Sequence, residues 1–286
     1  MLEVSLDPAA MYQVLLGVLK ARGKVMTAYS GGVDSTLLAV AARNALGKDF
    51  APAAIADSPS LPRHELEAAR ELAARHDIQL HTVQTDEISD HSYQQNDSDR
   101  CYFCKTHLYK SIKELALQMD IPFIACGTNH DDLSDYRPGQ MAADQAQVIA
   151  PLIEAKLGKQ QVRVLARFLG LANWDKPSSP CLASRVPYGT PVTIERLDRI
   201  ERAENILRSL GFRQFRVRHH EQLARIELPL SQVNHLLDDD IRVQIINELK
   251  KIGYLRITLD LEGFRSGSGN DQLGTSNTLK GGMGKP

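Results

Sequence analysis

The stretch Ser30-Gly31-Gly32-Val33-Asp34-Ser35-Thr36 decides the fold that we expect for this chain. The apolar run at 25–29 before it indicates a buried strand, and the apolar run at 37–42 after it indicates a helix. A strand that breaks at two glycines and turns directly into a helix forms an anion site, because the backbone can approach a phosphate closely and the first helical N–H groups point at it. The sequence therefore predicts a nucleotide-phosphate loop formed by Ser30, Gly31, Gly32, Val33, Asp34 and Ser35.

Asp34 indicates how the phosphate would be bound. A carboxylate beside a phosphate is repulsive unless a divalent cation lies between them, so Asp34 predicts Mg²⁺ on a bound ATP. The stretch is neither a Walker A loop, which ends in Lys-Ser/Thr, nor the dinucleotide fingerprint with three spaced glycines. The alternative is an ordinary turn in which Ser30 or Asp34 caps a helix. The joint occurrence of hydroxyls, glycines and a carboxylate favours the nucleotide site.

Strand and helix patterns alternate after this loop. Further strands are expected at 53–56, 78–83 and 122–126, with helices between them. This order predicts an α/β fold with a doubly wound parallel sheet. Ligands bind at the carboxyl ends of the strands in such sheets. We therefore expect three more ATP-binding residues at that edge, namely Asp57, Ser58 and Gly127.

The length of 286 residues and the change of pattern after Gly189 predict two domains. We expect a nucleotide domain at 1–188, a smaller C-terminal α+β domain at 189–265 and a disordered tail rich in Gly, Ser, Asn and Lys at 266–286. The net charge of −1 argues against a broad nucleic-acid-binding surface. The N-terminus lacks the pattern of a signal peptide, and no apolar run is long enough for a membrane span, so we expect a cytoplasmic protein with no membrane contact.

Cys181 lies in a loop with three prolines, residues 176–185. Lys176 and Arg185 flank it, and basic neighbours lower the pKa of a thiol and favour the reactive thiolate. A single cysteine is more often a small core residue, but a polar loop between two cations is not a core position. We therefore expect Cys181 to be reactive.

Three charged residues stand out in the C-terminal part. Glu204 interrupts the apolar stripe of a predicted helix, so it is either a member of a buried ion pair or a site residue. Arg216 and Arg218 alternate along a predicted strand and therefore share one of its faces. Two guanidinium groups in register suit a phosphate or a carboxylate, although an exposed strand face is an equally good explanation.

Together, these segments resemble the LarE family, the ATP-dependent sacrificial sulfur transferases of nickel-pincer nucleotide synthesis within the ATP-pyrophosphatase superfamily. The resemblance runs from about Lys24 to Gly267 and is carried by the segments 30–36, 135–139, 180–189, 216–218, 225–229 and 263–267. It implies that ATP adenylylates a carboxylate of pyridinium-3,5-biscarboxylic acid mononucleotide and that sulfur then displaces AMP, in two rounds. It also implies a homo-oligomer.

The resemblance implies a role for each matching residue. Cys181 matches the cysteine that surrenders its sulfur and becomes dehydroalanine, and we assign catalysis to Cys181, Asp34 and Glu204. Substrate binding is assigned to Arg185, Arg216 and Arg218. Competing functions are an amide ligase of the NAD synthetase type, a tRNA thiolase and a non-catalytic nucleotide-binding regulator.

Cys101 and Cys104 depart from the single-cysteine pattern. Residues at i and i+3 share a helix face, so with Cys181 they would supply three thiolates. The resemblance extends to family members that carry a [4Fe–4S] cluster on three cysteines and deliver a labile sulfide. Alternatives are a zinc site with His107 or Cys126 as fourth ligand, and two structural thiols or a disulfide.

Overall fold

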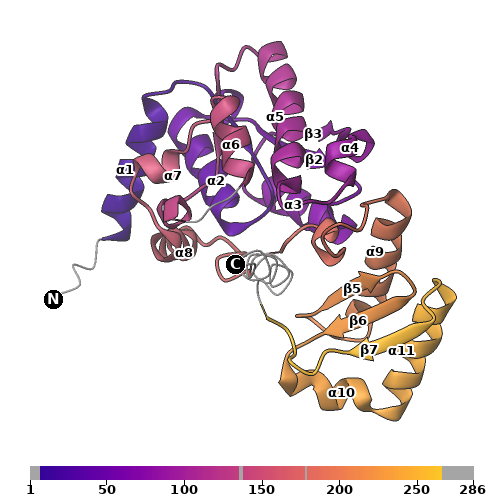
Figure 1. Ribbon diagram of the computed structural model, residues 1–286. Coiled ribbons are helices and arrows are strands. Elements are labelled where there is room, and N and C mark those ends of the chain that lie inside the picture. The colour runs from indigo at the N-terminus through magenta and orange to yellow at the C-terminus, as the bar shows by residue number, and fades with distance from the viewer. Residues whose placement is uncertain (1–6, 135–137, 178, 266–286) are drawn as a thin grey trace, which may run out of the picture. The chain divides into compact units, whose positions relative to one another are not determined.

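The computed structural model describes residues 7–134, 138–177 and 179–265, so the predicted disordered tail lies outside the described residues. The chain forms two compact units (Figure 1). The first comprises residues 1–87 and 101–179, and the second comprises 88–100 and 180–286. These bounds differ from the single predicted boundary near Gly189. The segment 88–100 reads locally as a polar loop of the nucleotide domain, yet it belongs to the second unit.

The first unit contains the predicted parallel sheet. Its strands are β1 (Val25–Ala28), β2 (Ala53–Asp57), β3 (Leu80–Gln84) and β4 (Phe123–Cys126). They lie in the order β3-β2-β1-β4, and each neighbouring pair is parallel. The predicted α/β class is confirmed. With β1 in the interior of the sheet, the phosphate loop that follows it lies between the ends of β2 and β4.

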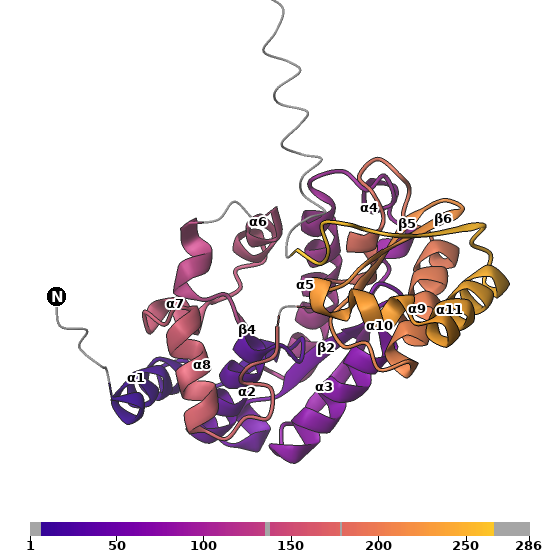
Figure 2. The same ribbon diagram turned by 90° about the horizontal axis from the view of Figure 1, so that it is seen from below.

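Successive residues of the strands pack against different helices, so each face of the sheet is covered by its own set of helices. Val25 and Ala125 pack with α1, α2 and α8, whereas Met26 and Ile124 pack with α5. Successive strand residues point to opposite faces, so both faces are covered by apolar side chains. Figures 1 and 2 show α1, α2 and α8 side by side. The helices are α1 (Pro8–Lys20), α2 (Val33–Leu46), α3 (Arg63–Arg75), α5 (Arg100–Gln118), α6 (Pro138–Gln145), α7 (Pro151–Glu154) and α8 (Lys159–Phe168).

The second unit is built on a three-stranded sheet in the order β5-β6-β7. The strand β5 (Arg216–His220) is antiparallel to β6 (Leu223–Glu227), and β7 (Arg256–Leu259) is parallel to β6. Thr193 caps the helix α9 (Ile194–Ser209) by accepting a hydrogen bond from the amide of Arg196 at 3.3 Å. The helices are α4 (His91–Gln94), α9 (Ile194–Ser209), α10 (Val233–Leu237) and α11 (Asp239–Lys251), with a 3₁₀ turn, η4, at Leu182–Arg185.

Candidate functional site

Two glycines of the nucleotide site are required by close packing. Gly31 has φ +70°, and a Cβ atom there would lie 2.7 Å from the Cβ atom of Ala69 on α3. A Cβ atom on Gly127, directly after β4, would lie 2.8 Å from the backbone nitrogen of Ser35. Each position therefore excludes any other residue without movement of the backbone. The predicted loop and the end of β4 are in contact, as we expected from the parallel sheet.

Hydrogen bonds within the loop fix its shape. The Ser35 hydroxyl lies 3.0 Å from the Ser30 hydroxyl, donates to the Gly32 carbonyl at 3.1 Å and accepts from the Ser30 amide at 3.2 Å. Asn173, which the sequence did not single out, donates to the Gly31 carbonyl at 3.1 Å. The loop is therefore held in one conformation, with the N-terminus of α2 at its end. That arrangement suits a phosphate anion.

Asp34 has a cationic partner. Its carboxylate forms an ion pair with Lys159 and accepts a hydrogen bond from the Asn129 amide at 3.1 Å. Asp131 in turn accepts from the backbone nitrogen of Lys159 at 2.7 Å and so caps α8. The Asp34 carboxylate is therefore paired with the Lys159 ammonium group in this structure. Carboxylate oxygens are also the type of ligand that binds Mg²⁺. In the sequence Lys159 is an ordinary first residue of a helix, and no neighbouring residue indicates that it pairs with Asp34.

Asp57 and Ser58 lie at the same sheet edge, immediately at the end of β2. Asp57 forms an ion pair with Arg63, and the Arg63 guanidinium also donates to the Ser58 carbonyl at 2.6 Å. The Ser58 hydroxyl donates to the carboxylate of Glu87, which is 1% exposed. The other carboxylate oxygen of Glu87 is buried and has no hydrogen-bond partner among the described residues. The role of Asp57 and Ser58 in ATP binding stays a prediction.

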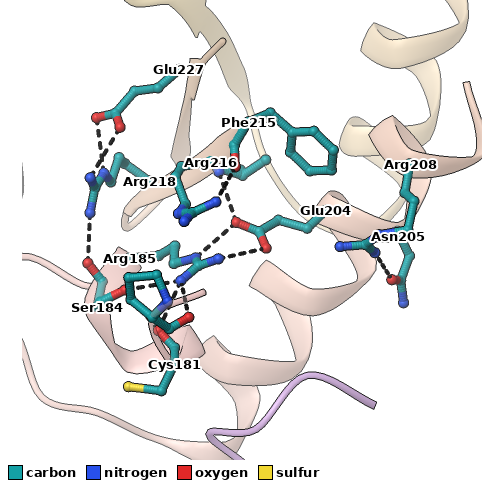
Figure 3. Close-up of polar contacts among 12 residues, drawn as sticks. Cys181, Ser184, Arg185, Glu204, Asn205, Arg208, Phe215, Arg216, Arg218 and Glu227 are labelled. Carbon is teal, nitrogen blue, oxygen red and sulfur yellow. Dashed lines mark hydrogen bonds and ion pairs between the residues drawn. The ribbon is translucent and has the colours of Figure 1, made fainter. Parts of the chain in front are cut away.

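The Cys181 loop begins the second part of the second unit. Cys181 is half-buried at the N-cap position of η4, and Arg185 is the last residue of that turn. The Arg185 guanidinium donates to the carbonyls of Pro180 at 2.6 Å and Cys181 at 3.0 Å. Figure 3 shows the Cys181 thiol pointing away from that guanidinium. Lys176 is paired with Glu65 in the first unit. Arg185 thus binds the loop backbone and Lys176 binds a carboxylate, in contrast to the predicted pair of cations acting on the thiol.

Glu204 is the buried ion-pair partner of Arg185, the first of the two alternatives raised by the sequence. The side-chain distances are 2.9 Å from Nε to Oε1 and 3.1 Å from Nη2 to Oε2, with both residues almost fully buried (Figure 3). Glu204 also accepts from the Val217 amide of β5 at 3.2 Å. It therefore joins η4, α9 and β5, and the prediction that it takes part in the chemistry remains untested.

Arg218 and Arg216 differ sharply although they lie two residues apart on β5. Arg218 is buried, pairs with both carboxylate oxygens of Glu227 at 2.9 and 3.0 Å, and donates to the Ser184 carbonyl at 2.7 Å. Arg216 is half-buried, donates to the Phe215 carbonyl at 2.7 Å and lies 5.0 Å from the centre of the Phe264 ring. No described carboxylate is within ion-pair distance of Arg216. The exposed-face explanation is therefore wrong for Arg218.

The charges around Arg216 leave a positive surplus. Arg185 and Arg218 are each balanced by a buried glutamate, whereas Arg216 stands between them without one (Figure 3). Burial and the nearby Arg185 cation lower the pKa of Arg216 to about 10. Both effects disfavour its charged form, so an anion bound there would be strongly favoured. This is the arrangement expected of a phosphate or carboxylate site.

Cys101 and Cys104 lie in the first turns of α5, one exposed and one half-buried, and no disulfide joins cysteines among the described residues. The two candidates for a fourth zinc ligand have other partners. His107 bonds Asp86 at 2.6 Å, and the buried Cys126 sulfur lies 3.1 Å from the Thr128 hydroxyl. In the described ranges no three His, Cys, Asp or Glu side chains form a ready metal-binding group. A structural zinc site needs four ligands, whereas a [4Fe–4S] cluster with one open iron needs three thiolates, and the cluster on Cys101, Cys104 and Cys181 stays a prediction.

Comparison with known proteins decides the family. The NAD synthase family matches residues 16–179. Pyridinium-3,5-bisthiocarboxylic acid mononucleotide synthase (LarE) of Lactiplantibacillus plantarum is 38% identical over 259 residues, which cover 91% of this chain and 93% of that protein. This chain belongs to the LarE family. An uncharacterized protein of Synechocystis sp. is 45% identical over 87% of the chain, and one of Methanocaldococcus jannaschii is 28% identical over 85%.

The LarE family membership confirms the resemblance drawn from the motifs, and with it an ATP-dependent enzyme with a nucleotide domain of the NAD synthase type. The matched region, residues 16–179, contains the phosphate loop, Asp34 and Lys159 and ends where the first unit ends. Among the described residues, no helix combines the length and apolarity needed to cross a membrane.

Proposed function

We propose that this chain transfers sulfur to pyridinium-3,5-biscarboxylic acid mononucleotide at the expense of ATP and so forms the bisthiocarboxylic acid. The LarE relative carries the name of that product. The observation that supports the substrate class is the surplus cation Arg216, in the same unit as the Cys181 loop. The substrate is a mononucleotide with one phosphate and two carboxylates, which is the type of anion that such a site binds.

Activation of the substrate takes place on the first unit. The loop amides and the N-terminus of α2 bind the phosphates of ATP, with Mg²⁺ held at Asp34 to neutralise the charge of the departing pyrophosphate. With Mg²⁺ bound at Asp34, the ammonium group of Lys159, which pairs with Asp34 in this structure, would be available to bind a phosphate oxygen. A substrate carboxylate oxygen then attacks the α-phosphate, the bond to the β-phosphate breaks, and pyrophosphate leaves. The product is an acyl-adenylate.

Sulfur transfer takes place at the Cys181 loop of the second unit. Arg216 binds the substrate phosphate, while Arg185 and Arg218 hold the loop carbonyls through the bonds described above. In the sacrificial route, the Cys181 thiolate attacks the acyl carbon and AMP leaves. Loss of the Cα proton then breaks the Cβ–S bond, which gives the thiocarboxylate and a dehydroalanine. Each chain could complete one such transfer.

A second source of sulfur is supported by the two additional cysteines. We infer that Cys101, Cys104 and Cys181 hold a [4Fe–4S] cluster, since three thiols are present and both candidate fourth ligands are otherwise bonded. When bound, such a cluster supplies a labile sulfide that replaces the cysteine sulfur as the transferred atom. In that case Cys181 is a ligand and is not consumed. A homo-oligomer and a cytoplasmic location stay predictions.

Pyrophosphate release with a panel of acceptors tests the proposed substrate. With Mg·ATP, the pyridinium dicarboxylate should stimulate release strongly, whereas deamido-NAD with ammonia and unmodified tRNA should not. The first alternative represents the amide ligases and the second the tRNA thiolases. Stimulation by tRNA or by deamido-NAD, with none by the pyridinium dicarboxylate, would overturn the proposal.

A further inference from the structure

One face of the sheet in the second unit carries arginines. Val217 of β5 and Ile226 of β6 pack into the apolar core of this unit, together with side chains of α9 and α11. Because successive residues of a strand point to opposite faces, their sequence neighbours lie on the other face. These neighbours include Arg216, Arg218, Arg225 and Glu227, all of which belong to the second unit.

The register between β5 and β6 places Arg225 beside both arginines of β5. Arg225 is directly opposite Arg218, and Glu227 is directly opposite Arg216. Arg225 is therefore the diagonal neighbour of Arg216. Diagonal neighbours on one face of an antiparallel pair lie roughly 7–8 Å apart, within the reach of long side chains. A small ligand with two anionic groups can therefore contact both arginines.

Glu227 and Asp260 orient the Arg225 side chain. The Glu227 Oε1 atom accepts a hydrogen bond from Arg225 Nη2 at 3.1 Å and another from Arg218 Nε at 2.9 Å. Asp260 Oδ2 lies 3.4 Å from Arg225 Nε. Because Glu227 is opposite Arg216, the first contact draws the Arg225 guanidinium group toward that arginine. Both contacts use the Nε–Nη2 edge of the guanidinium group.

The remaining edge of the Arg225 guanidinium group is open. No acceptor for its Nη1 atom lies among the described residues, and 39% of the side chain is exposed. Arg218 differs, since it is buried and its donors bind Glu227 and the Ser184 carbonyl. A guanidinium edge with two N–H donors suits a carboxylate, which it binds through two parallel hydrogen bonds. Arg225 therefore has the access and the donors that a ligand carboxylate needs.

We propose that Arg225 binds a ring carboxylate of the substrate while Arg216 binds its phosphate. This face of the second unit then distinguishes a pyridinium dicarboxylate mononucleotide from mononucleotides that lack ring carboxylates. The inference rests on the proposed function for the identity of the ligand. Arg216 alone is sufficient for a phosphate, whereas a second arginine, presented diagonally to it, suits a second anionic group.

Calorimetric titration of the full-length protein with two mononucleotides separates the two contacts. The probes are pyridinium-3,5-biscarboxylic acid mononucleotide and nicotinamide mononucleotide, which has the phosphate but a neutral amide and no carboxylate. Arg225→Gln should weaken binding of the dicarboxylate about 10–100-fold, the loss that corresponds to a charged hydrogen bond, and leave the affinity for nicotinamide mononucleotide unchanged. Arg216→Ala should weaken binding of both probes. Arg225→Lys should be intermediate, because it keeps the charge but loses the planar fork.

Arg256→Gln is the matched control. Arg256 lies on β7 opposite Leu223, on the same face of the sheet, and is exposed. Its removal takes one positive charge from this face and leaves the contacts of Arg225 in place, so it measures the general effect of the charge. Arg225→Gln should remain folded, because Arg218 still pairs with both carboxylate oxygens of Glu227. Urea unfolding of each variant checks this, and Arg225→Lys gives the answer if Arg225→Gln does not fold.

The outcomes distinguish this inference from the proposed function. Binding of the dicarboxylate by Arg225→Gln as tightly as by the wild type overturns the role of Arg225 and leaves the proposed function standing. Equal losses for the two probes also overturn it, because a structural effect or a general charge effect does not depend on ring carboxylates. A wild-type protein that binds neither mononucleotide overturns the proposed substrate as well.

Discussion

Arg185 and Glu204 face each other in a two-point ion pair, with side-chain distances of 2.9 and 3.1 Å and only 2% and 4% of the two side chains exposed. Glu204 belongs to α9, and Arg185 lies at the end of the turn that follows Cys181. Because the same guanidinium donates to the Cys181 carbonyl, the pair fixes the backbone that carries the thiol. Glu204, to which the sequence analysis assigns a catalytic role, thus holds Arg185 in place beneath the Cys181 backbone.

Glu204→Gln should therefore destabilise the protein. The substitution leaves the buried Arg185 charge without compensation, which typically costs about 3–5 kcal/mol. Urea unfolding followed by circular dichroism gives the free energy of unfolding. Glu221→Gln is the control, since Glu221 pairs with Arg196 but its side chain is 65% exposed, and such pairs contribute about 1 kcal/mol or less. Equal, small losses in the two variants would show that the buried pair has no special weight.

Asp34→Ala should abolish substrate-dependent pyrophosphate release and leave the fold intact. The carboxylate is needed to hold Mg²⁺ between the loop and the phosphates. Its loss frees Lys159, whose side chain is 42% exposed and can be solvated instead. Pyrophosphate release is measured in parallel with thermal unfolding. Asp77→Ala is the control, because Asp77 also pairs with two cations, Arg43 and Lys48, but at an exposed helix end. Release at the wild-type rate by a folded Asp34→Ala protein would refute the role of Asp34.

Arg216→Ala and Arg218→Ala should differ in kind. Arg216 pairs with no described carboxylate, so its removal should weaken binding of the pyridinium mononucleotide and change stability little. A charged hydrogen bond of about 1.5–3 kcal/mol corresponds to a loss of roughly 10–100-fold. Arg218→Ala should also lower stability, because Glu227 is 1% exposed and loses its two-point partner. Calorimetric titration with the mononucleotide and with an ATP analogue separates the two sites.

The pH dependence of this binding supplies a check on the same arginine. Because the pKa of Arg216 is lowered to about 10, its cation is lost as the pH rises through that value. Mononucleotide affinity should fall correspondingly in the wild type, and Arg216→Ala should lack this component of the pH dependence. Affinity that is flat through pH 10, or Arg216→Ala that binds the mononucleotide as the wild type does, would remove Arg216 from the substrate site.

The lowered pKa of His219 should make the stability of the second unit depend on pH. It is 1% exposed, its Nδ1 atom lies 3.1 Å from the Tyr254 hydroxyl, and burial together with the nearby Arg199 lowers its pKa to about 4. The unfolded chain binds this proton near pH 6.5, so stability falls as the pH drops below that value and the loss is complete near pH 4. Between pH 7 and pH 5 the loss should be roughly 2 kcal/mol from this residue. His219→Asn should flatten the pH dependence of urea unfolding, and an unchanged slope would contradict the assignment.

The phosphate loop and the sheet could be predicted because their signals are local. Two glycines, two serines and a carboxylate occur within seven residues, and the strands are short apolar runs. Lys159 and Asn173 had no such signal, since their partners Asp34 and Gly31 lie 125 and 142 residues away. Each reads alone as an ordinary polar residue.

The place of the segment 88–100 in the second unit could not be predicted for a related reason. Its polar residues indicate a solvated loop, yet Asn96 is fully buried because its polar atoms bond carbonyls about 90 residues further along the chain. Local composition cannot show that a polar side chain has distant partners. The same limit applies to Glu204, whose ion-pair partner Arg185 lies 19 residues away in the sequence.

Mass spectrometry of the small-molecule product tests the central claim most directly. The anaerobically prepared protein is incubated with Mg·ATP and the pyridinium dicarboxylate, and the product is examined for exchange of carboxylate oxygen for sulfur. We predict the thiocarboxylate with the wild type and none with Cys181→Ala, and the mass of the recovered protein then reports whether Cys181 became dehydroalanine or survived as a cluster ligand. Formation of pyrophosphate and AMP with no sulfur in the product, or sulfur transfer at the wild-type level by Cys181→Ala, would contradict the account.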